Sequence, residues 1–121
     1  MKILDSNILI YSFTDAFQYL RPLILEQGIF ASEITRLEVL GFHNLSIDEE
    51  VYFKETFLEL TTLMIDISIM DEAIRLRREY KMKLGDSIVA ATALVHGLEL
   101  YTRNTADFEK VTSLKVVNPV R

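Results

Sequence analysis

Residues 1–10, MKILDSNILI, hold the feature that decides the fold, an apolar segment that ends in a carboxylate. Residues 2–4 are typical of a short buried strand, and Asp5, Ser6 and Asn7 follow at once. Such residues cap helix N-termini by accepting backbone N–H groups. The carboxyl end of a buried parallel strand is also where open α/β sheets place their functional sites. The choice between a cap and a site depends on the rest of the chain.

Length and composition set the broad class. The chain has 121 residues, half of them hydrophobic, which predicts one self-sufficient domain over residues 1–121. No apolar run approaches the roughly 18 residues that span a bilayer, and no secretory signal is evident, so we expect a cytoplasmic protein. The absence of cysteine excludes disulfides and thiolate metal sites. The net charge of −5 argues against nucleic-acid binding through bulk charge, but it suits an acidic site for a divalent cation.

Strand-like and helix-like segments alternate along the chain. Apolar segments predict strands at residues 2–4, 29–32, 63–66, 98–102 and 114–117. Helical patterns cover residues 16–27, 33–42, 46–60, 68–82 and 86–96, and residues 104–111 suggest a turn or a short helix. Ser46 and Glu49 have the spacing of a capping box, and Gly97 ends a helix. This alternation predicts the α/β class, with a parallel sheet covered on both faces.

Four acidic residues stand out by their location in the predicted elements. Asp5 ends the first strand, Glu38 lies about a turn and a half into the helix after the second, Asp86 starts a helix, and Asp107 follows the fourth strand. Each has a structural explanation. Asp86 fits a helix first turn, Asp107 a cap in a turn, and Glu38 a solvated helix position. The carboxyl ends of parallel strands share one edge, so Asp5 and the turn after the fourth strand are expected to meet there. Spacing alone does not place Asp86, which follows a helix.

Four segments together resemble a PIN domain, and more narrowly a VapC-type toxin of bacterial and archaeal toxin–antitoxin systems. They are ILDSNILIY (3–11), ITRLEVL (34–40), LGDSIVAATALVHGLELYTRNTADFEKV (84–111) and LKVVNP (114–119). The resemblance implies a three-layer α/β/α fold around a parallel sheet of four or five short strands. It implies a metal-dependent endoribonuclease, acting as a homodimer and held inactive by a cognate antitoxin.

The resemblance also implies roles for individual residues. Asp5, Glu38 and Asp86 match the catalytic acids, with Asp5 and Asp86 as the metal ligands. Ser6 and Thr102 match positions that hydrogen-bond the acidic cluster.

The family's fourth acidic position is occupied here by Asn104, which is a departure. Asp107 lies close by in sequence, so either residue is a candidate to complete the site. A cluster with only oxygen ligands selects a hard ion, Mg²⁺ or Mn²⁺. Such an ion activates water and stabilises charge on a phosphodiester.

Five of the thirteen basic residues fall between positions 75 and 83, just before Asp86. They form either a solvated helix face, paired locally with Glu72 and Glu79, or a phosphate-binding strip. Arg36 and Arg103 flank two of the acidic motifs. The RNA-binding candidates are therefore Arg36, Arg78, Lys81, Lys83 and Arg103.

Other interpretations of the sequence remain. A non-catalytic PIN-fold module that binds RNA or a protein is the main alternative, and the Asn104 departure favours it slightly. A phosphotransfer site with Asp5 as nucleophile would need a second aspartate where Asn7 stands. His43 and His96 have no catalytic partner at a suggestive spacing. Phe53 and Phe57, four residues apart on one helix, belong either to a partner surface or to the core.

Overall fold

A computed structural model describes residues 1–121. Its centre is a five-stranded sheet in the order β3-β2-β1-β4-β5, and every pair of neighbouring strands is parallel. The chain therefore builds outward from β1 in one direction and then returns to build on its other side. The strands are β1 (Lys2–Leu4), β2 (Ile29–Ser32), β3 (Thr61–Leu63), β4 (Glu99–Tyr101) and β5 (Val116–Val117).

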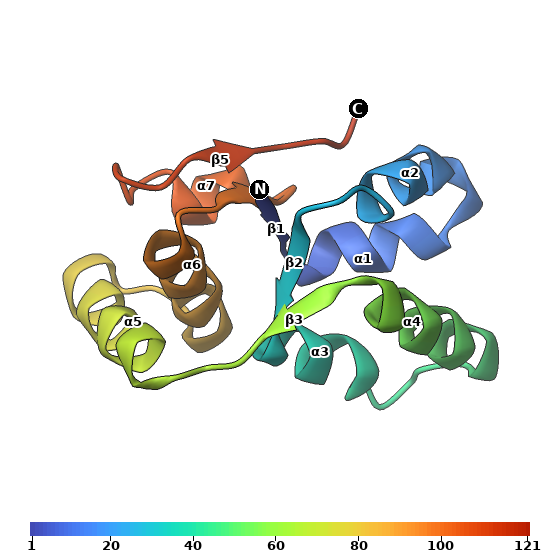
Figure 1. The fold of residues 1–121 in the computed structure, drawn as a ribbon, viewed down its shortest axis with the longest axis horizontal. Helices are drawn as coiled ribbons and strands as arrows, with labels where there is room; N and C mark the ends of the chain where they lie inside the picture. The colour runs from blue at the N-terminus through green and yellow to red at the C-terminus, as the bar shows by residue number, and fades with distance from the viewer.

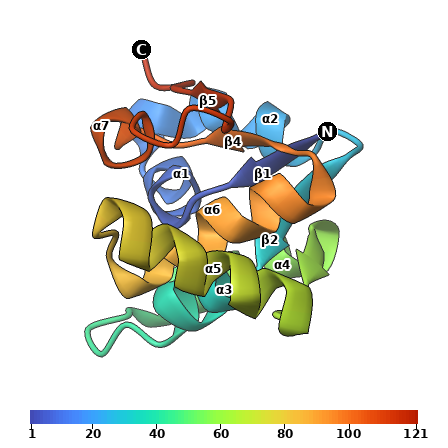
Figure 2. The same cartoon turned by 90° about the vertical axis from the view of Figure 1, so that its left-hand side faces the viewer.

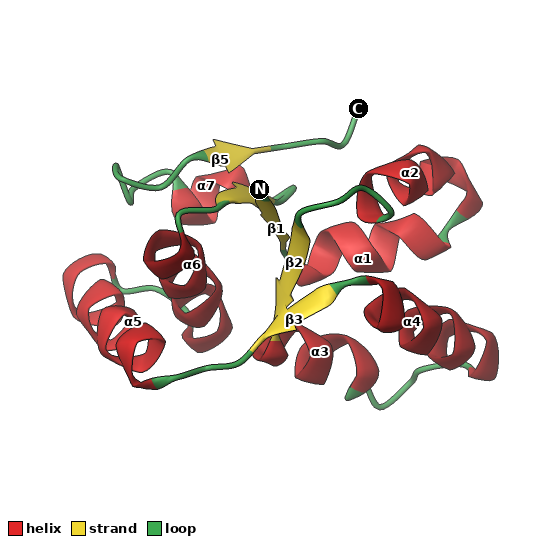
Figure 3. Cartoon of the chain, in the orientation of Figure 1, coloured by secondary structure: helices red, strands yellow, loops and turns green.

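Helices cover both faces of this sheet (Figure 1). One group packs on one face and the other group on the opposite face, which gives the three-layer α/β/α arrangement that was expected (Figures 1 and 3). The first group is α1 (Ser6–Phe13), the 3₁₀ helix η1 (Asp15–Leu20), α2 (Arg21–Ile24), α3 (Glu33–Leu40) and α4 (Ile47–Glu59). The second is α5 (Ile67–Tyr80), α6 (Leu84–His96) and α7 (Thr105–Phe108).

The pleat of β1 divides the interior into two cores. Ile3 packs with α5, α6 and α7, whereas Leu4 packs with α1, α2 and α4, because successive side chains of a strand point to opposite faces. Both residues are fully buried. Figure 2 shows α5 and α6 stacked in front of the sheet, where α6 supplies an unbroken buried run from Ser87 to Ala93. A strand buried on both faces is what an all-parallel sheet requires.

Local capping signals match the structure closely. The Ser46 side chain accepts the Glu49 N–H at 3.1 Å, and the Glu49 carboxylate accepts the Ser46 N–H at 3.1 Å, which completes the capping box of α4. Gly97 ends α6 in the left-handed conformation, at φ +65°. A residue with a Cβ is strained in that conformation, so glycine suits this position.

Two sequence predictions were displaced. The helix expected at residues 16–27 is instead η1 followed by the four-residue α2. Pro22 explains the break, because proline has no N–H to donate to the carbonyl of residue 18. The strand expected at residues 63–66 is Thr61–Leu63, whose register pairs Phe30 with Thr61, and Asp66 instead caps α5.

None of the helices combines the length and the apolar character that a membrane span requires.

Candidate active site

The candidate site lies where the chain changes direction in the sheet. β1 and β4 are neighbours, with Leu4 beside Tyr101, and the Asp5 N–H donates to the Tyr101 carbonyl at 3.0 Å. The next residues, Asp5 and Thr102, therefore leave the sheet side by side. The region outside the carboxyl ends of the strands, where the strand order reverses, is where open α/β sheets bind their ligands.

Asp5 uses its two carboxylate oxygens differently. Oδ1 accepts the Ser6 N–H at 2.9 Å and so caps α1. Oδ2 accepts the Thr102 hydroxyl at 2.9 Å and an amide N–H of Asn7 at 3.0 Å. Asp5 thus caps α1 and also lies in the candidate site. Thr102 contacts Asp5 through its side chain, as predicted, whereas Ser6 does so through its backbone.

Asn7 connects the two strand ends, a role that the sequence analysis did not assign to it. Its amide nitrogen also lies 3.1 Å from the Thr102 hydroxyl, and its carbonyl oxygen accepts the Arg103 N–H at 3.0 Å. Thr102 in turn accepts the Asn104 N–H at 3.1 Å. The sequence did contain a signal for this role. An Asn two positions after the acid at a strand end commonly hydrogen-bonds nearby backbone groups.

Burial dominates the ionisation of Asp5, which is only 5% exposed. Desolvation raises its pKa above the usual value, and the hydrogen bonds from Thr102, Ser6 and Asn7 offset part of that rise. The charge of Asp107 adds a further, smaller increase to the pKa of Asp5. Burial therefore favours the neutral form of Asp5, and its three hydrogen-bond donors favour the ionised form.

Glu38 and Asp86 come from two helices that meet at the same edge. A Cβ placed on Gly85 would lie 2.8 Å from Oε2 of Glu38, so the Glu38 carboxylate rests on the first turn of α6. The pKa of Glu38 is raised, first by partial burial and then by the charges of Asp5 and Asp86. The pKa of Asp86 is raised by partial burial and by the charges of Asp5 and Asp107. The negative charge of Asp5 therefore acts on both Glu38 and Asp86.

The fourth position contains two different residues with two different contributions. Asn104 is exposed and contributes a backbone N–H to Thr102, while its side chain makes no cap hydrogen bond to α7. Asp107, in the first turn of α7, contributes charge, since it raises the pKa of both Asp5 and Asp86. We call Asp5, Glu38, Asp86 and Asp107 the acidic site.

The acidic site suits a hard divalent cation in its donor chemistry. All its donors are carboxylate oxygens. The pKa values of Glu38 and Asp86 are raised by burial and then by neighbouring negative charges, and a bound cation would relieve that repulsion. No three His, Asp or Glu side chains of the chain lie close enough together to surround an ion by themselves. A divalent cation at this edge would therefore be held by only one or two carboxylates together with several waters, as is common for Mg²⁺.

The basic candidates occupy different places. Lys83 and Lys110 lie near Asp86, as shown by the lowering effect of both charges on the Asp86 pKa. The sequence analysis did not identify Lys110. Arg75 is instead paired with Glu72 and with Glu79, the second pair at 2.6 Å. Arg77 donates to the Met82 carbonyl at 3.2 Å. The basic residues between positions 75 and 83 therefore fall into two groups. Those around Arg75 are paired locally on a helix face, and Lys83 lies near the acidic residues.

Three other RNA-binding candidates lie outside the acidic site. Arg36 lines a shallow depression with Leu40, Lys54, Phe57 and Leu58, between α3 and α4. Arg78 lies beside Glu79 and Asp71 on α5, and Lys81 ends that helix with φ +54°. Only Arg103 continues directly from the hydrogen-bonded strand ends.

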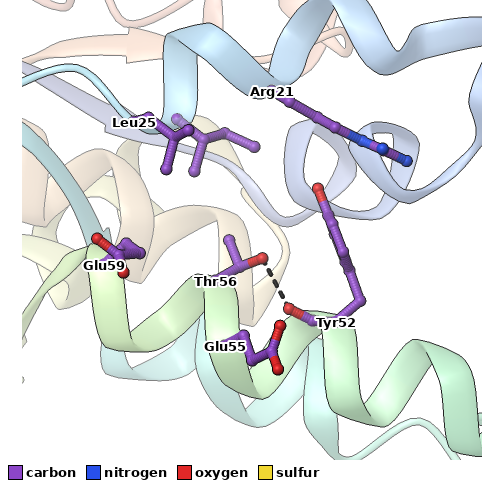
Figure 4. Close-up of a pocket in the computed structure, with 7 residues that line it drawn as sticks. Arg21, Leu25, Tyr52, Glu55, Thr56 and Glu59 are labelled. Atoms are coloured by element: carbon purple, nitrogen blue, oxygen red, sulfur yellow. Dashed lines mark hydrogen bonds between the residues drawn. The ribbon is translucent and has the colours of Figure 1, made fainter.

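A separate cleft of about 380 Å³ lies between α2 and α4 (Figure 4). Within it, the Thr56 hydroxyl donates to the Tyr52 carbonyl at 2.8 Å. Phe53 and Phe57 of the same helix are 1% and 8% exposed, so they belong to the core and not to a partner surface. None of the four acids lines this cleft, whose lining residues are Arg21, Ile24, Leu25, Tyr52, Glu55, Thr56 and Glu59.

Comparison with known proteins agrees with this architecture. The PIN domain family matches residues 2–114, so the chain belongs to the PIN domain family. A toxin–antitoxin complex from Klebsiella pneumoniae contains a chain that is 34% identical, with a TM-score of 0.82, over 100% of this chain and 99% of that one. The resemblance to PIN domains found in the sequence is thereby confirmed.

More distant structures share the fold. VapBC2 from Rickettsia felis, bound to a DNA fragment from its promoter, is 18% identical with a TM-score of 0.81, covering 97% of both chains. VapBC-1 from nontypeable Haemophilus influenzae is 22% identical with a TM-score of 0.76, covering 97% of this chain and 96% of that one. No protein of curated function matches the sequence.

Proposed function

We propose that the protein is a divalent-metal-dependent endoribonuclease, the toxin of a VapBC-type toxin–antitoxin pair. The proposal is supported mainly by the placement of three acids: Asp5 caps α1 at the end of β1, and the Glu38 carboxylate lies against Gly85, the residue before Asp86 in the first turn of α6. PIN domain membership and the 34% identical toxin–antitoxin chain support it.

In this proposal Asp5 and Asp86 hold Mg²⁺ or Mn²⁺, and Glu38 orients the attacking water. The bound ion supplies charge stabilisation at the scissile phosphate and lowers the pKa of water. Asp5 is held in place by Thr102 and Asn7, so its carboxylate cannot turn away. Asp107 adds negative charge at the rim, while Lys83 and Lys110 offer positive charge beside Asp86.

Cleavage of RNA tests the proposal directly. We expect purified protein to cut single-stranded RNA with Mg²⁺ or Mn²⁺, and EDTA to stop the reaction. Asp5→Asn should abolish cleavage, because it removes the charge most central to the site while preserving the helix cap, since Asn is also a good N-cap. Cleavage that survives in EDTA or in Asp5→Asn contradicts the proposal.

A non-catalytic RNA- or protein-binding module is the second candidate. Asn104 favours it, because a neutral residue stands where the family has an acid, and its side chain is exposed. A binding module would retain RNA affinity in EDTA and show no cleavage with any divalent ion. Its Asp5→Asn variant would bind RNA as tightly as the wild type.

We further propose a cognate antitoxin as protein partner and a homodimer as the active assembly, both in the cytoplasm. The antitoxin is supported by the toxin–antitoxin complexes among the structural relatives. Co-expression with a candidate antitoxin tests the partner, because a cognate pair should purify together and lack ribonuclease activity. Light scattering of the purified chain tests the dimer.

A further inference from the structure

A line of aromatic rings and arginines begins at the acidic site and runs along α1 and η1. We call it the aromatic strip and define it as Arg103, Tyr11, Phe17, Tyr19 and Arg121. It starts beside Asp5, because the Arg103 N–H bonds the same Asn7 side chain that contacts Asp5. The C-terminal tail runs from β5 toward α2 and brings Arg121 to the other end of the strip (Figure 1).

Each member of the strip contacts the next. The Arg103 guanidinium lies 5.0 Å from the Tyr11 ring centre and donates to its hydroxyl. The Tyr11 and Phe17 ring centres are 4.8 Å apart, and those of Phe17 and Tyr19 are 6.2 Å apart. The Arg121 guanidinium lies 4.6 Å from the Tyr19 ring centre. Tyr11, Phe17 and Tyr19 each pack against the core that contains Leu4, and each residue is half-buried and not fully covered.

Both arginines carry charge that no carboxylate side chain neutralises. Neither Arg103 nor Arg121 forms a salt bridge, unlike Arg75, which is paired with two glutamates. Asp15 is the only acidic residue of η1, and its partner is Arg21, at 4.0 Å. The strip therefore carries, at each end, a guanidinium that forms no salt bridge, in a chain with net charge −5.

We propose that the aromatic strip binds single-stranded RNA by stacking bases on Tyr11, Phe17 and Tyr19, with phosphates near Arg103 and Arg121. Aromatic rings combined with cationic side chains are the usual means of holding a single strand without reading its sequence. Double-stranded RNA keeps its base faces stacked inside the helix, so the strip selects unpaired substrate. This inference rests on the proposed ribonuclease function, because the strip leads one strand into the acidic site.

Binding of a labelled single-stranded RNA in EDTA, followed by fluorescence anisotropy, tests the strip without cleavage. Tyr11→Leu, Phe17→Leu and Tyr19→Leu should each weaken binding on the order of tenfold, since one stacked base is lost. Tyr11→Phe keeps the ring and should bind like the wild type. Tyr80→Leu is the matched control, because Tyr80 is also half-buried against a core but lies on α5.

An abasic strand of equal length separates stacking from charge. The leucine variants and the wild type should bind this probe equally, because it offers no base to stack. Arg103→Gln and Arg121→Gln change exposed side chains and keep the fold, and each should lower the salt slope by about 0.7. These two variants keep the test decisive if a leucine variant melts below the assay temperature.

The outcomes distinguish the strip from the ribonuclease function. If the wild type cleaves RNA and the leucine variants bind RNA as tightly as it does, the strip is wrong and the ribonuclease stands. If the variants lose equal affinity for RNA and for the abasic strand, the rings do not stack and the proposal is overturned. If the wild type neither binds nor cleaves RNA, both proposals fall. If the leucine variants bind RNA like the wild type but no longer bind an antitoxin, the aromatic strip is a protein-binding surface and the proposal is overturned.

Discussion

The Thr102 hydroxyl donates a 2.9 Å hydrogen bond to Oδ2 of Asp5, although the two residues are separated by 97 positions in the sequence. This bond joins the ends of β1 and β4 at the point where the sheet reverses its direction of growth. Thr102 is fully buried, so its hydroxyl is reserved for this network and not for solvent. The orientation of the most buried acid therefore depends on a residue in the last third of the chain.

Thr102→Val tests this dependence. The bond from Thr102 lowers the pKa of Asp5, so its loss should raise that pKa further and shift the acid limb of the pH–rate profile to higher pH. Cleavage should fall about 10- to 100-fold, as for other partners of metal-site ligands. Thr102→Ser retains the hydroxyl and should restore both. An unchanged pH profile in Thr102→Val would remove the hydrogen bond from the account.

Replacing the three catalytic candidates should separate them from the fourth acid. We expect Asp5→Asn, Glu38→Gln and Asp86→Asn each to lower the cleavage rate by at least about 100-fold. Asp107→Asn should have a smaller effect, because its charge is the smallest contribution to the pKa of Asp5. Single-turnover cleavage measures all four. A loss in Asp107→Asn equal to that in Asp86→Asn would make Asp107 a full member of the catalytic set.

Gly85 gives a test of geometry that does not alter charge. A Cβ at this position would lie 2.8 Å from Oε2 of Glu38, and this flexible carboxylate would move aside. Gly85→Ala should therefore reduce cleavage about tenfold or more while leaving the melting temperature unchanged or higher, because Ala is the better helix former. Gly97→Ala, at the left-handed end of α6, is the contrasting control and should lower stability with little effect on cleavage.

Lys83 and Lys110 should contribute to RNA binding, whereas Arg75 should not. Both lysines lie near Asp86 and are free of salt bridges, while Arg75 is held by two glutamates. Lys83→Gln and Lys110→Gln should each reduce the slope of log affinity against log salt by about 0.7. Arg75→Gln is the control and should leave the slope unchanged. If all three variants keep the wild-type slope, the two lysines do not contact RNA phosphates and the basic residues form a solvated surface.

The metal-free protein should lose stability as pH rises, because the pKa values of Asp5, Glu38 and Asp86 are all raised. Above about pH 4 the unfolded chain has released these protons while the folded chain still holds them, so the free energy of unfolding falls until the raised pKa values are passed. Asp86→Asn should remove part of this fall. Thermal melts in EDTA across that range measure it, and parallel curves for the two proteins would contradict the assignment.

Local signals explain how much of the fold was predictable. The strand at residues 2–4, the strand at residues 29–32 and the capping box of α4 depend on neighbours in sequence, and all were predicted correctly. β3 was displaced because its position is set by pairing with β2, which no local pattern contains. The helix at residues 16–27 failed because the effect of Pro22 on the preceding turn was not considered.

The candidate site was predictable only in part. The sequence placed Asp5 at a strand end, but Asp86 follows a helix, and its approach to Glu38 depends on contact between α3 and α6. Asn7 and Lys110 were missed because their roles depend on long-range partners, Thr102 for the first and Asp86 for the second. The assignment of Glu38 and Asp86 to the same site as Asp5 came from the resemblance to PIN domains, because residue spacing alone did not place them together.

The central claim, that Asp5, Glu38 and Asp86 form one acidic site for a divalent cation, is tested most directly by the melting temperature at pH 7 with and without Mg²⁺. Without metal, Asp86→Asn should melt above the wild type, because one repelling charge is gone. Mg²⁺ at ten times its Kd should stabilise the wild type by about 1.4 kcal/mol, a shift of roughly 5 °C, and Asp86→Asn much less. If Asp86→Asn melts lower in EDTA and Mg²⁺ shifts neither protein, the acids are separate helix caps and the claim is contradicted.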